Sequence, residues 1–266
     1  MDPKLEDKHV LITGASGGIG TVTTRLFLQK NARVTAHYHR QIEPLKILKN
    51  NYPETLNLVQ ADIRRESDVK NLFDKSTDHF GRIAVLIANA GIWPSDDVPI
   101  HEMTFKQWQN TIAVNLTGVF LCVKYFFQNL KSYPAKHASL ILVGSTAGVF
   151  GEAGHADYAA SKAALSGLMK TLKNEIIHLA EHGRVNLVNP GWTLTSMAKK
   201  SLKDKTTVKR VLQTIPLRKI ALPMDIGQMI VYLASDNLSG HVSGQEITIA
   251  GGMEGRVLFL PEEVDQ

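Results

Sequence analysis

Short apolar segments alternate along the chain with longer segments of helical periodicity. The short segments are rich in Val, Ile and Leu and are mostly apolar throughout, as expected of strands buried on both faces of a parallel sheet. The predicted strands are 10–13, 33–37, 56–60, 83–88, 139–143, 184–188 and 245–249. Helical spacing covers 19–30, 67–80, 105–130, 158–182 and 225–234.

This alternation predicts an α/β fold, because strand–helix–strand units form right-handed crossovers and build a doubly wound parallel sheet of the Rossmann type. The sequence contains no linker, internal repeat or low-complexity stretch, so residues 1–266 are predicted to form a single domain. The polar segment 194–216 interrupts the alternation and is predicted to be a small inserted lid.

Composition narrows the classes of function. With 44% hydrophobic and 21% charged residues, the chain has the composition of a globular protein. Thirty basic and 25 acidic residues give a formal charge of +5, too small to indicate a nucleic-acid binder. The one cysteine, Cys122, excludes an intrachain disulfide, and the histidines lack a spaced carboxylate or cysteine set, so we predict no metal site.

The sequence shows no targeting or membrane segment. The first nine residues are charged and lack the apolar stretch of a signal peptide. No uninterrupted apolar run approaches the roughly 18 residues of a membrane span. We therefore expect a cytoplasmic protein with no membrane partner.

The first chemical motif is TGASGGIG at 13–20, which follows a predicted strand and opens a helix. Glycines allow a tight turn and let a pyrophosphate approach the first helical turn, where free N–H groups and the helix dipole favour an anion. The spacing G-x-x-x-G-x-G differs from the common G-x-G-x-x-G. Taken alone the motif is compatible with a purely structural turn.

Tyr158 and Lys162 form a second motif. They are four residues apart on a predicted helix, so both side chains project from one face. A nearby ammonium favours the phenolate, so we expect Lys162 to lower the pKa of Tyr158 towards that of a general acid/base. In isolation, such a pair is more often a surface tyrosine beside a solvated lysine.

Three further polar residues are candidates for a functional site. Ser145 comes just after a predicted strand, where ligands bind in open α/β sheets, although a simple turn serine is common there. Asn89, with Gly91 nearby, lies at the end of another strand and suits the close approach of a flat cofactor. Asn115 is an amide within an apolar helical stretch and needs hydrogen-bond partners if buried.

In their order and spacing these motifs resemble those of the short-chain dehydrogenase/reductase family, over nearly the whole chain up to Met253. The resemblance implies an NAD(P)-dependent oxidoreductase and a homotetramer. It implies that Tyr158 transfers the proton, Ser145 orients the carbonyl, Lys162 holds the nicotinamide ribose and Asn115 anchors a water in the proton relay. The residues implied to bind the cofactor are Gly14, Ser16, Gly18, Ile19, Gly20, His39, Arg40, Asp62, Ile63, Asn89, Gly91, Tyr158, Lys162, Pro190, Gly191 and Thr193.

We predict NADP as the preferred cofactor, with NAD as the alternative. An acidic residue at the end of the second strand binds the ribose hydroxyls of NAD and repels a 2′-phosphate. Here Tyr38 aligns with that acidic position, and His39 and Arg40 follow it. A guanidinium can bind the phosphate through two hydrogen bonds. The alternative is that Arg40 is only the solvated start of the next helix.

The substrate is less defined. We expect Trp93, Trp192 and His155 to line its pocket together with Ser145 and Tyr158, whereas His37, His39 and His79 are expected at the surface. The segments 215–219 and 232–253 resemble those of 3-oxoacyl-(acyl-carrier-protein) reductases, which implies an acyl-carrier or coenzyme A thioester. Glu152, Trp192 and Ser196 depart from that pattern, so a sugar, polyol or secondary-alcohol dehydrogenase is the alternative. A non-catalytic dinucleotide-binding protein is disfavoured because Tyr158 and Lys162 are both present.

The predicted lid carries a concentration of positive charge. Between residues 197 and 210 it holds six basic residues and one acidic residue. The simpler interpretation is a solvated helix face that maintains solubility. The alternative is that this charge steers an anionic partner towards the cleft.

Overall fold

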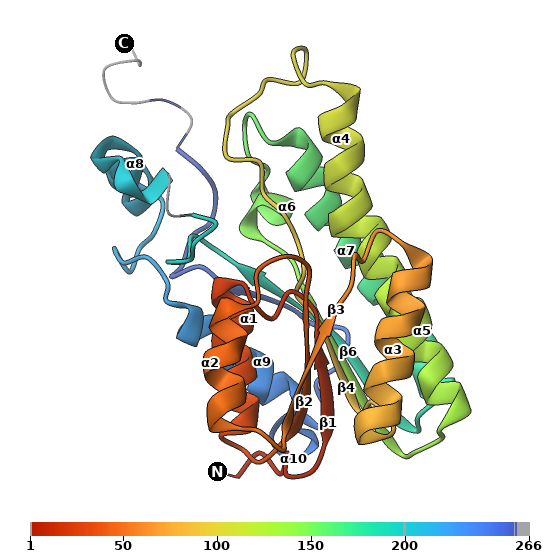
Figure 1. Ribbon diagram of the computed structural model, residues 1–266. Coiled ribbons are helices and arrows are strands. Elements are labelled where there is room, and N and C mark those ends of the chain that lie inside the picture. The colour runs from red at the N-terminus through yellow and green to blue at the C-terminus, as the bar shows by residue number, and fades with distance from the viewer. Residues whose placement is uncertain (1, 199–200, 258, 260–266) are drawn as a thin grey trace.

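The predicted strands form a single parallel sheet in the order β3-β2-β1-β4-β5-β6-β7 (Figure 1). The computed structural model describes residues 2–198, 201–257 and 259. The strands are β1 His9–Ile12, β2 Arg33–Tyr38, β3 Leu56–Gln60, β4 Val85–Ala88, β5 His137–Val143, β6 His182–Pro190 and β7 Glu246–Ile249. Because the strand order reverses between β1 and β4, a ligand crevice is expected beyond the carboxyl ends of these two strands.

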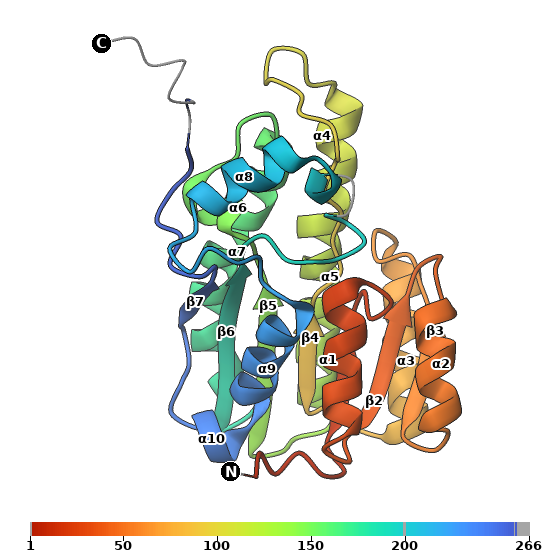
Figure 2. The same ribbon diagram turned by 90° about the vertical axis from the view of Figure 1, so that its left-hand side faces the viewer.

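Helices cover both faces of the sheet (Figures 1 and 2). One face packs against α1 (Gly18–Leu28), α2 (Glu43–Asn51) and α9 (Pro223–Ala234), and the other against α3 (Glu66–Phe80), α5 (Gly118–Ser132) and α7 (Ala156–Glu175). Each interface holds its own cluster of buried apolar side chains. The doubly wound Rossmann architecture predicted from the sequence is therefore confirmed.

The long helix expected at 105–130 contains an irregular turn. It comprises α4 (Phe105–Ile112), a π-helical turn at Ala113–Thr117 and α5, and the N–H of Gly118 bonds to the carbonyl of Ala113 five residues earlier. By length and composition, the combined helix Phe105–Ser132 could cross a membrane. Some of its apolar side chains, such as Phe126, are buried against the sheet, whereas Phe105 and Phe120 are exposed.

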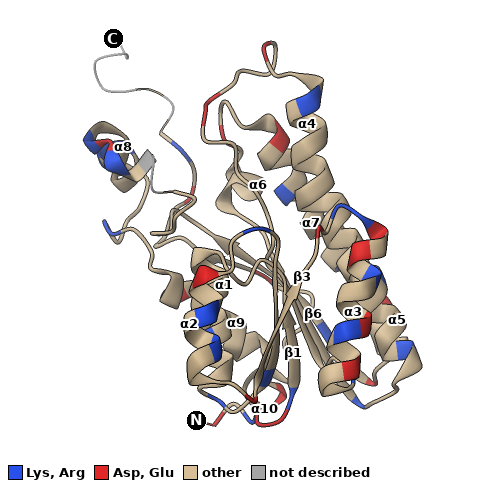
Figure 3. Cartoon of the chain, viewed as in Figure 1, with Lys and Arg blue, Asp and Glu red and all other residues tan. Residues whose placement is uncertain are grey.

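The segment 194–216 lies above the carboxyl end of the sheet, beside the start of α1. Its described residues include a 3₁₀ turn at Ser201–Lys203 and α8 (Lys205–Gln213), and Asp204 caps α8 by accepting from the N–H of Thr207 at 2.8 Å. Basic residues recur along α8 (blue in Figure 3). Their side chains are exposed. Lys199 and Lys200, which contribute to the basic cluster of the sequence, lie outside the described residues.

Three short helices complete the described chain. α6 (Thr146–Phe150) follows β5, α10 (Asp236–Ser239) follows α9, and a 3₁₀ turn at Ile176–His178 ends the α7 segment. The sequence pattern gave no bounds for α2, although a helix after Arg40 was considered, and α6 was not predicted.

Candidate active site

The glycine-rich loop between β1 and α1 closes tightly onto the end of β4. Gly14 has φ +62°, and a Cβ on it would lie 2.7 Å from the Cα of Ala90. A Cβ on Gly18 would lie 2.7 Å from the side chain of Thr195. No side chain caps the N-terminus of α1, so its first N–H groups remain available to a ligand.

His37 lies beneath this loop, so the expectation that it is a surface histidine is wrong. Its side chain is buried, its Nδ1 accepts from the N–H of Gly14 at 3.0 Å, and its Nε2 donates to the carbonyl of Ala61 at 3.0 Å. Burial lowers the pKa of His37 to about 4. The neutral imidazole therefore ties the glycine loop to the segment after β3.

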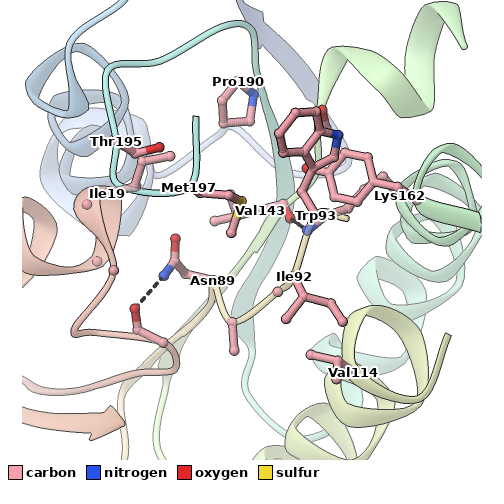
Figure 4. A pocket seen from close by; sticks show the side chains of 18 of the residues that line it. Ile19, Asn89, Ile92, Trp93, Val114, Val143, Lys162, Pro190, Thr195 and Met197 are labelled. Atoms are coloured by element: carbon pink, nitrogen blue, oxygen red, sulfur yellow. Dashed lines mark hydrogen bonds between the residues drawn. The ribbon is translucent and has the colours of Figure 1, made fainter. Parts of the chain in front are cut away.

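The ends of β1 and β4 are joined by a second set of hydrogen bonds. Asn89 donates from Nδ2 to the carbonyls of Thr13 at 3.0 Å and Gly14 at 3.1 Å (Figure 4). The next glycine, Gly91, leaves open space beside two predicted catalytic residues. A Cβ there would lie 3.2 Å from Oδ1 of Asn115 and 3.3 Å from Nζ of Lys162.

Asn115 occupies the π-helical turn and is completely buried. Its Oδ1 accepts from the N–H of Ile92 at 2.8 Å, and its Nδ2 donates to the carbonyl of Ile92 at 2.9 Å and to Oγ of Ser161 at 3.1 Å. Both amide hydrogens are therefore used. The side chain holds the loop after β4 against α7, and its amide hydrogens are not available to a water molecule.

Ser145, Tyr158 and Lys162 meet at the end of β5. Ser145 caps α6, with its Oγ accepting from the N–H of Ala147 at 3.1 Å, and its hydroxyl is also hydrogen-bonded to Tyr158. Lys162 donates from Nζ to the carbonyl of Val143 at 2.8 Å, and this Nζ lies 5.9 Å from the centre of the Tyr158 ring.

The pKa expected for Tyr158 from its spacing to Lys162 is wrong in this structure. Burial raises the pKa of Tyr158 to about 12, and only partial opposition comes from the Ser145 hydrogen bond. Burial likewise lowers the pKa of Lys162 to about 8. The sequence spacing placed both groups on one helix face but did not reveal that Lys162 binds a strand carbonyl and that desolvation dominates.

A cavity of about 750 Å³ extends from the glycine loop to Tyr158. Figure 4 shows side chains from several elements converging on it. The predicted residues that line it are Gly14, Ser16, Gly18, Ile19, Gly20, His39, Arg40, Asp62, Ile63, Asn89, Gly91, Trp93, Ser145, Tyr158, Lys162, Pro190, Gly191, Trp192 and Thr193. This volume lies within the range of about 300–1,000 Å³ typical of ligand sites.

His155 does not line this cavity, which corrects its predicted place in the substrate pocket. It is buried behind Trp93, with the two rings stacked at a centroid distance of 4.8 Å, and its Nε2 lies 2.8 Å from the carbonyl of Pro94. The ring of Trp93 meets that of Trp192 edge to face at 6.0 Å. His155 therefore supports an aromatic wall without reaching the cavity.

Three charged residues of the cavity were missed from the sequence. Arg64 lies beside Asp62 in the cavity and binds it through three hydrogen bonds, from Nε to Oδ1 at 2.9 Å and to Oδ2 at 3.1 Å, and from a terminal nitrogen to Oδ2 at 2.6 Å. This contact lowers the pKa of Asp62 to about 2. Glu152 and Arg256 lie at the other end of the cavity. Proximity to the predicted Asp62 could have indicated Arg64, whereas no sequence signal connects Arg256 to a site about a hundred residues earlier.

The comparison with known proteins agrees with this geometry. A family model described as enoyl-(acyl carrier protein) reductase matches residues 14–254. The chain belongs to the short-chain dehydrogenase/reductase family. It is therefore an oxidoreductase of that family, as its ordered motifs implied.

Several curated relatives match almost end to end. A 3-oxoacyl-[acyl-carrier-protein] reductase of Thermotoga maritima is 35% identical, covering 94% of this chain and 99% of its own. A 3-oxoacyl-[acyl-carrier-protein] reductase of Synechocystis sp. is 33% identical, with 91% and 95% coverage. A cis-4-hydroxycyclohexanecarboxylate dehydrogenase of Sinomonas cyclohexanicum is 30% identical, with 95% and 98% coverage.

A solved structure supports the same relationship. A short-chain dehydrogenase/reductase from Brucella melitensis, described as a glucose/ribitol dehydrogenase, superposes with a TM-score of 0.85 at 29% identity. The match covers 95% of this chain and 98% of that one. The family fold thus extends over essentially the whole length of both proteins.

Proposed function

We propose that this protein transfers a hydride between NADP(H) and a carbonyl or secondary alcohol. One observation carries the proposal: Ser145, Tyr158 and Lys162 line the same cavity as an uncapped helix N-terminus and its glycine loop. A phosphate-binding end and an acid–base end in one cavity are what a nicotinamide dinucleotide enzyme requires.

The residues present fit this cofactor. Gly14 and Gly18 keep side chains away from the N-terminus of α1, and Gly91 leaves Lys162 accessible from the cavity. The first turn of α1 would bind the pyrophosphate, Asp62 and Ile63 would lie against the adenine, and Lys162 would hold the nicotinamide ribose. When bound, the nicotinamide supplies or accepts the hydride.

Tyr158 would move the proton. With its pKa raised to about 12, the phenol stays protonated at neutral pH and can donate to a substrate oxygen during reduction. The hydroxyl of Ser145 would donate a hydrogen bond to the same oxygen and so orient the carbonyl. Asn115 would anchor a water in the proton relay by accepting a hydrogen bond from it, because both of its amide hydrogens are already engaged.

The charges at the adenine end support NADP over NAD. Arg40, Arg64 and His39 line this part of the cavity, and the acidic group there, Asp62, is neutralised by Arg64. Tyr38 ends β2 and packs against the core cluster instead of presenting a carboxylate. Because Arg64 is paired with Asp62, the guanidinium of Arg40 is the group that would bind a 2′-phosphate, which NAD lacks.

Two substrate classes fit the reaction. The names of the Thermotoga and Synechocystis relatives support a 3-oxoacyl thioester, and the exposed basic residues of α8 suit its anionic carrier. The second class is a sugar, polyol or other secondary alcohol. It is favoured by Trp93 and Trp192, which with Glu152 give the cavity a compact wall that is partly aromatic and partly charged.

We further propose that the enzyme acts in the cytoplasm as a homotetramer, and that residues 1–266 form one dinucleotide-binding domain with 194–216 as its lid. Among the described residues, no group of three or more His, Cys, Asp or Glu is arranged to hold a metal ion. The proposed chemistry uses no metal.

A substrate panel tests the function. Purified protein is mixed with NADPH or NADH and β-ketoacyl thioesters, simple ketones, sugars or polyols, and the nicotinamide absorbance is followed. We expect saturable NADPH binding and cofactor consumption with at least one carbonyl class. Absence of saturable binding of both cofactors would contradict the proposal.

A further inference from the structure

The segment after β7 brings an arginine back into the active-site cavity. This segment runs beside α6 (Figure 2), and Arg256 lines the cavity together with Glu152. Nε of Arg256 donates to the carbonyl of Gly151 at 2.6 Å, and one terminal nitrogen donates to Oγ1 of Thr146 at 3.4 Å. The guanidinium is thus fixed in orientation by the two ends of α6.

Glu152 is the acidic partner of this arginine. Its Oε1 lies 3.9 Å from a terminal nitrogen of Arg256, an ion-pair distance that is too long for a direct hydrogen bond. The two side chains are only 14% and 16% exposed, respectively. The carboxylate of Glu152 can accept further hydrogen bonds, and the guanidinium of Arg256 can donate them, at positions where little of either side chain reaches solvent. Leaving such buried polar groups without partners is costly.

The pair lies close enough to the reacting end of the cavity to act on Tyr158. The charge of Glu152 raises the pKa of Tyr158, and that of Arg256 lowers it. A substrate oxygen held by Tyr158 would therefore have these two groups as neighbours. The rings of Trp93 and Trp192 line the same cavity and contact each other edge to face.

We propose that Glu152 and Arg256 form a hydroxyl-binding subsite, so that the substrate carries a hydroxyl next to its reacting carbon, as in a vicinal diol or α-hydroxy ketone. A hydroxyl donates to the carboxylate and accepts from the guanidinium at the same time. A substrate carboxylate would face Glu152, and a substrate ammonium would face Arg256. The aromatic wall accommodates the C–H face of a ring.

The inference rests on the proposed function only in placing the reacting carbon of the substrate at Tyr158. The subsite is therefore tested first by substrate binding, which does not require turnover. The protein, saturated with NADP⁺, is titrated with cis-1,2-cyclohexanediol and separately with cyclohexanol, which lacks the second hydroxyl. Tryptophan fluorescence reports binding because Trp93 and Trp192 line the cavity, and oxidation is followed in parallel by nicotinamide absorbance.

We expect the diol to bind about ten-fold or more tightly than cyclohexanol, as for a hydrogen bond to a charged group. Glu152→Gln and Arg256→Met should each remove most of this preference while leaving cyclohexanol binding unchanged. Glu254→Gln is the matched control, because this exposed residue lies on the same segment but does not line the cavity. It should keep the full preference for the diol.

Three outcomes would overturn the subsite. Equal affinity of the wild-type protein for diol and cyclohexanol is one, and this result does not depend on any variant folding. A diol preference that survives Glu152→Gln would assign the pair only to anchoring the C-terminal segment. Tighter binding of cis-4-hydroxycyclohexanecarboxylate than of the diol would identify Arg256 as an anion site. Selective diol binding without oxidation would count against the proposed function and leave the subsite intact.

Discussion

Two buried neutral histidines should make the protein sensitive to mild acid. Burial lowers the pKa of His37, and also that of His9, from 6.5 to about 4. The unfolded chain therefore binds two protons in a range where the folded protein excludes them. This stabilisation is fully present above pH 6.5 and is lost as the pH falls towards 4.

The magnitude follows from the two pKa values. At 1.36 kcal/mol per pKa unit, each histidine should reduce the free energy of unfolding by about 2.5 kcal/mol between pH 7 and 4.5. The two together account for about 5 kcal/mol, a large fraction of the 5–15 kcal/mol typical of a folded protein. The carboxyl of Asp62, with its pKa lowered to about 2, contributes only at lower pH.

Urea unfolding at several pH values between 7 and 4.5 measures this loss. In His37→Asn the side chain no longer titrates, so the pH-dependent loss should fall by about half, whatever the stability of the variant at pH 7. His178→Asn, at an exposed position, is the matched control and should behave as the wild type. An unchanged pH dependence in His37→Asn would refute the reasoning.

Two further predictions concern ligands. NADPH should bind more tightly than NADH, and Arg40→Ala combined with Arg64→Ala should remove this preference in cofactor titrations; tighter binding of NADH to the wild-type protein would contradict the assignment of both arginines. If the enzyme reduces acyl thioesters, kcat/KM for a thioester should fall more steeply with added salt than kcat/KM for a small neutral ketone, because clustered charge raises association rates by about 10–10³ at low salt. Changing the exposed Lys203, Lys205 and Lys209 to Gln should remove the difference, and equal salt slopes in the wild type would leave this charge with a solubility role only.

The sequence predicted the sheet well because its strands are continuous apolar runs. Each predicted strand formed within a few residues of its expected position, as in 56–60 and Leu56–Gln60. The glycine loop and the serine at the end of β5 were also placed, because both follow from where a parallel strand ends. Local pattern was sufficient for these features.

The predictions that were wrong or missing depend on burial and on contacts between residues far apart in the sequence. His37 was expected at the surface, yet the glycine loop folds over it and the N–H of Gly14 donates a hydrogen bond to its imidazole. His155 was placed one turn before Tyr158 but is turned away behind Trp93. The position of Arg256 depends on the path of the chain after β7, which no local pattern contains.

The direction of the pKa shift of Tyr158 also could not be predicted from the sequence. Sequence spacing identified a cation near the phenol, but the sign of the shift depends on desolvation and on what Lys162 binds. With its pKa raised to about 12, the phenol of Tyr158 is protonated at neutral pH. Whether a residue acts as acid or base is thus decided by packing, which the sequence does not display.

The most direct test of the account is the replacement Tyr158→Phe, which removes only the hydroxyl proposed to transfer the proton. The measurement pairs NADPH binding with turnover of the best carbonyl substrate found in the panel. We predict that NADPH binding is retained and that turnover falls by at least about 10²-fold, the lower range for a general acid–base group. Near-normal turnover of that substrate by Tyr158→Phe would contradict the central claim.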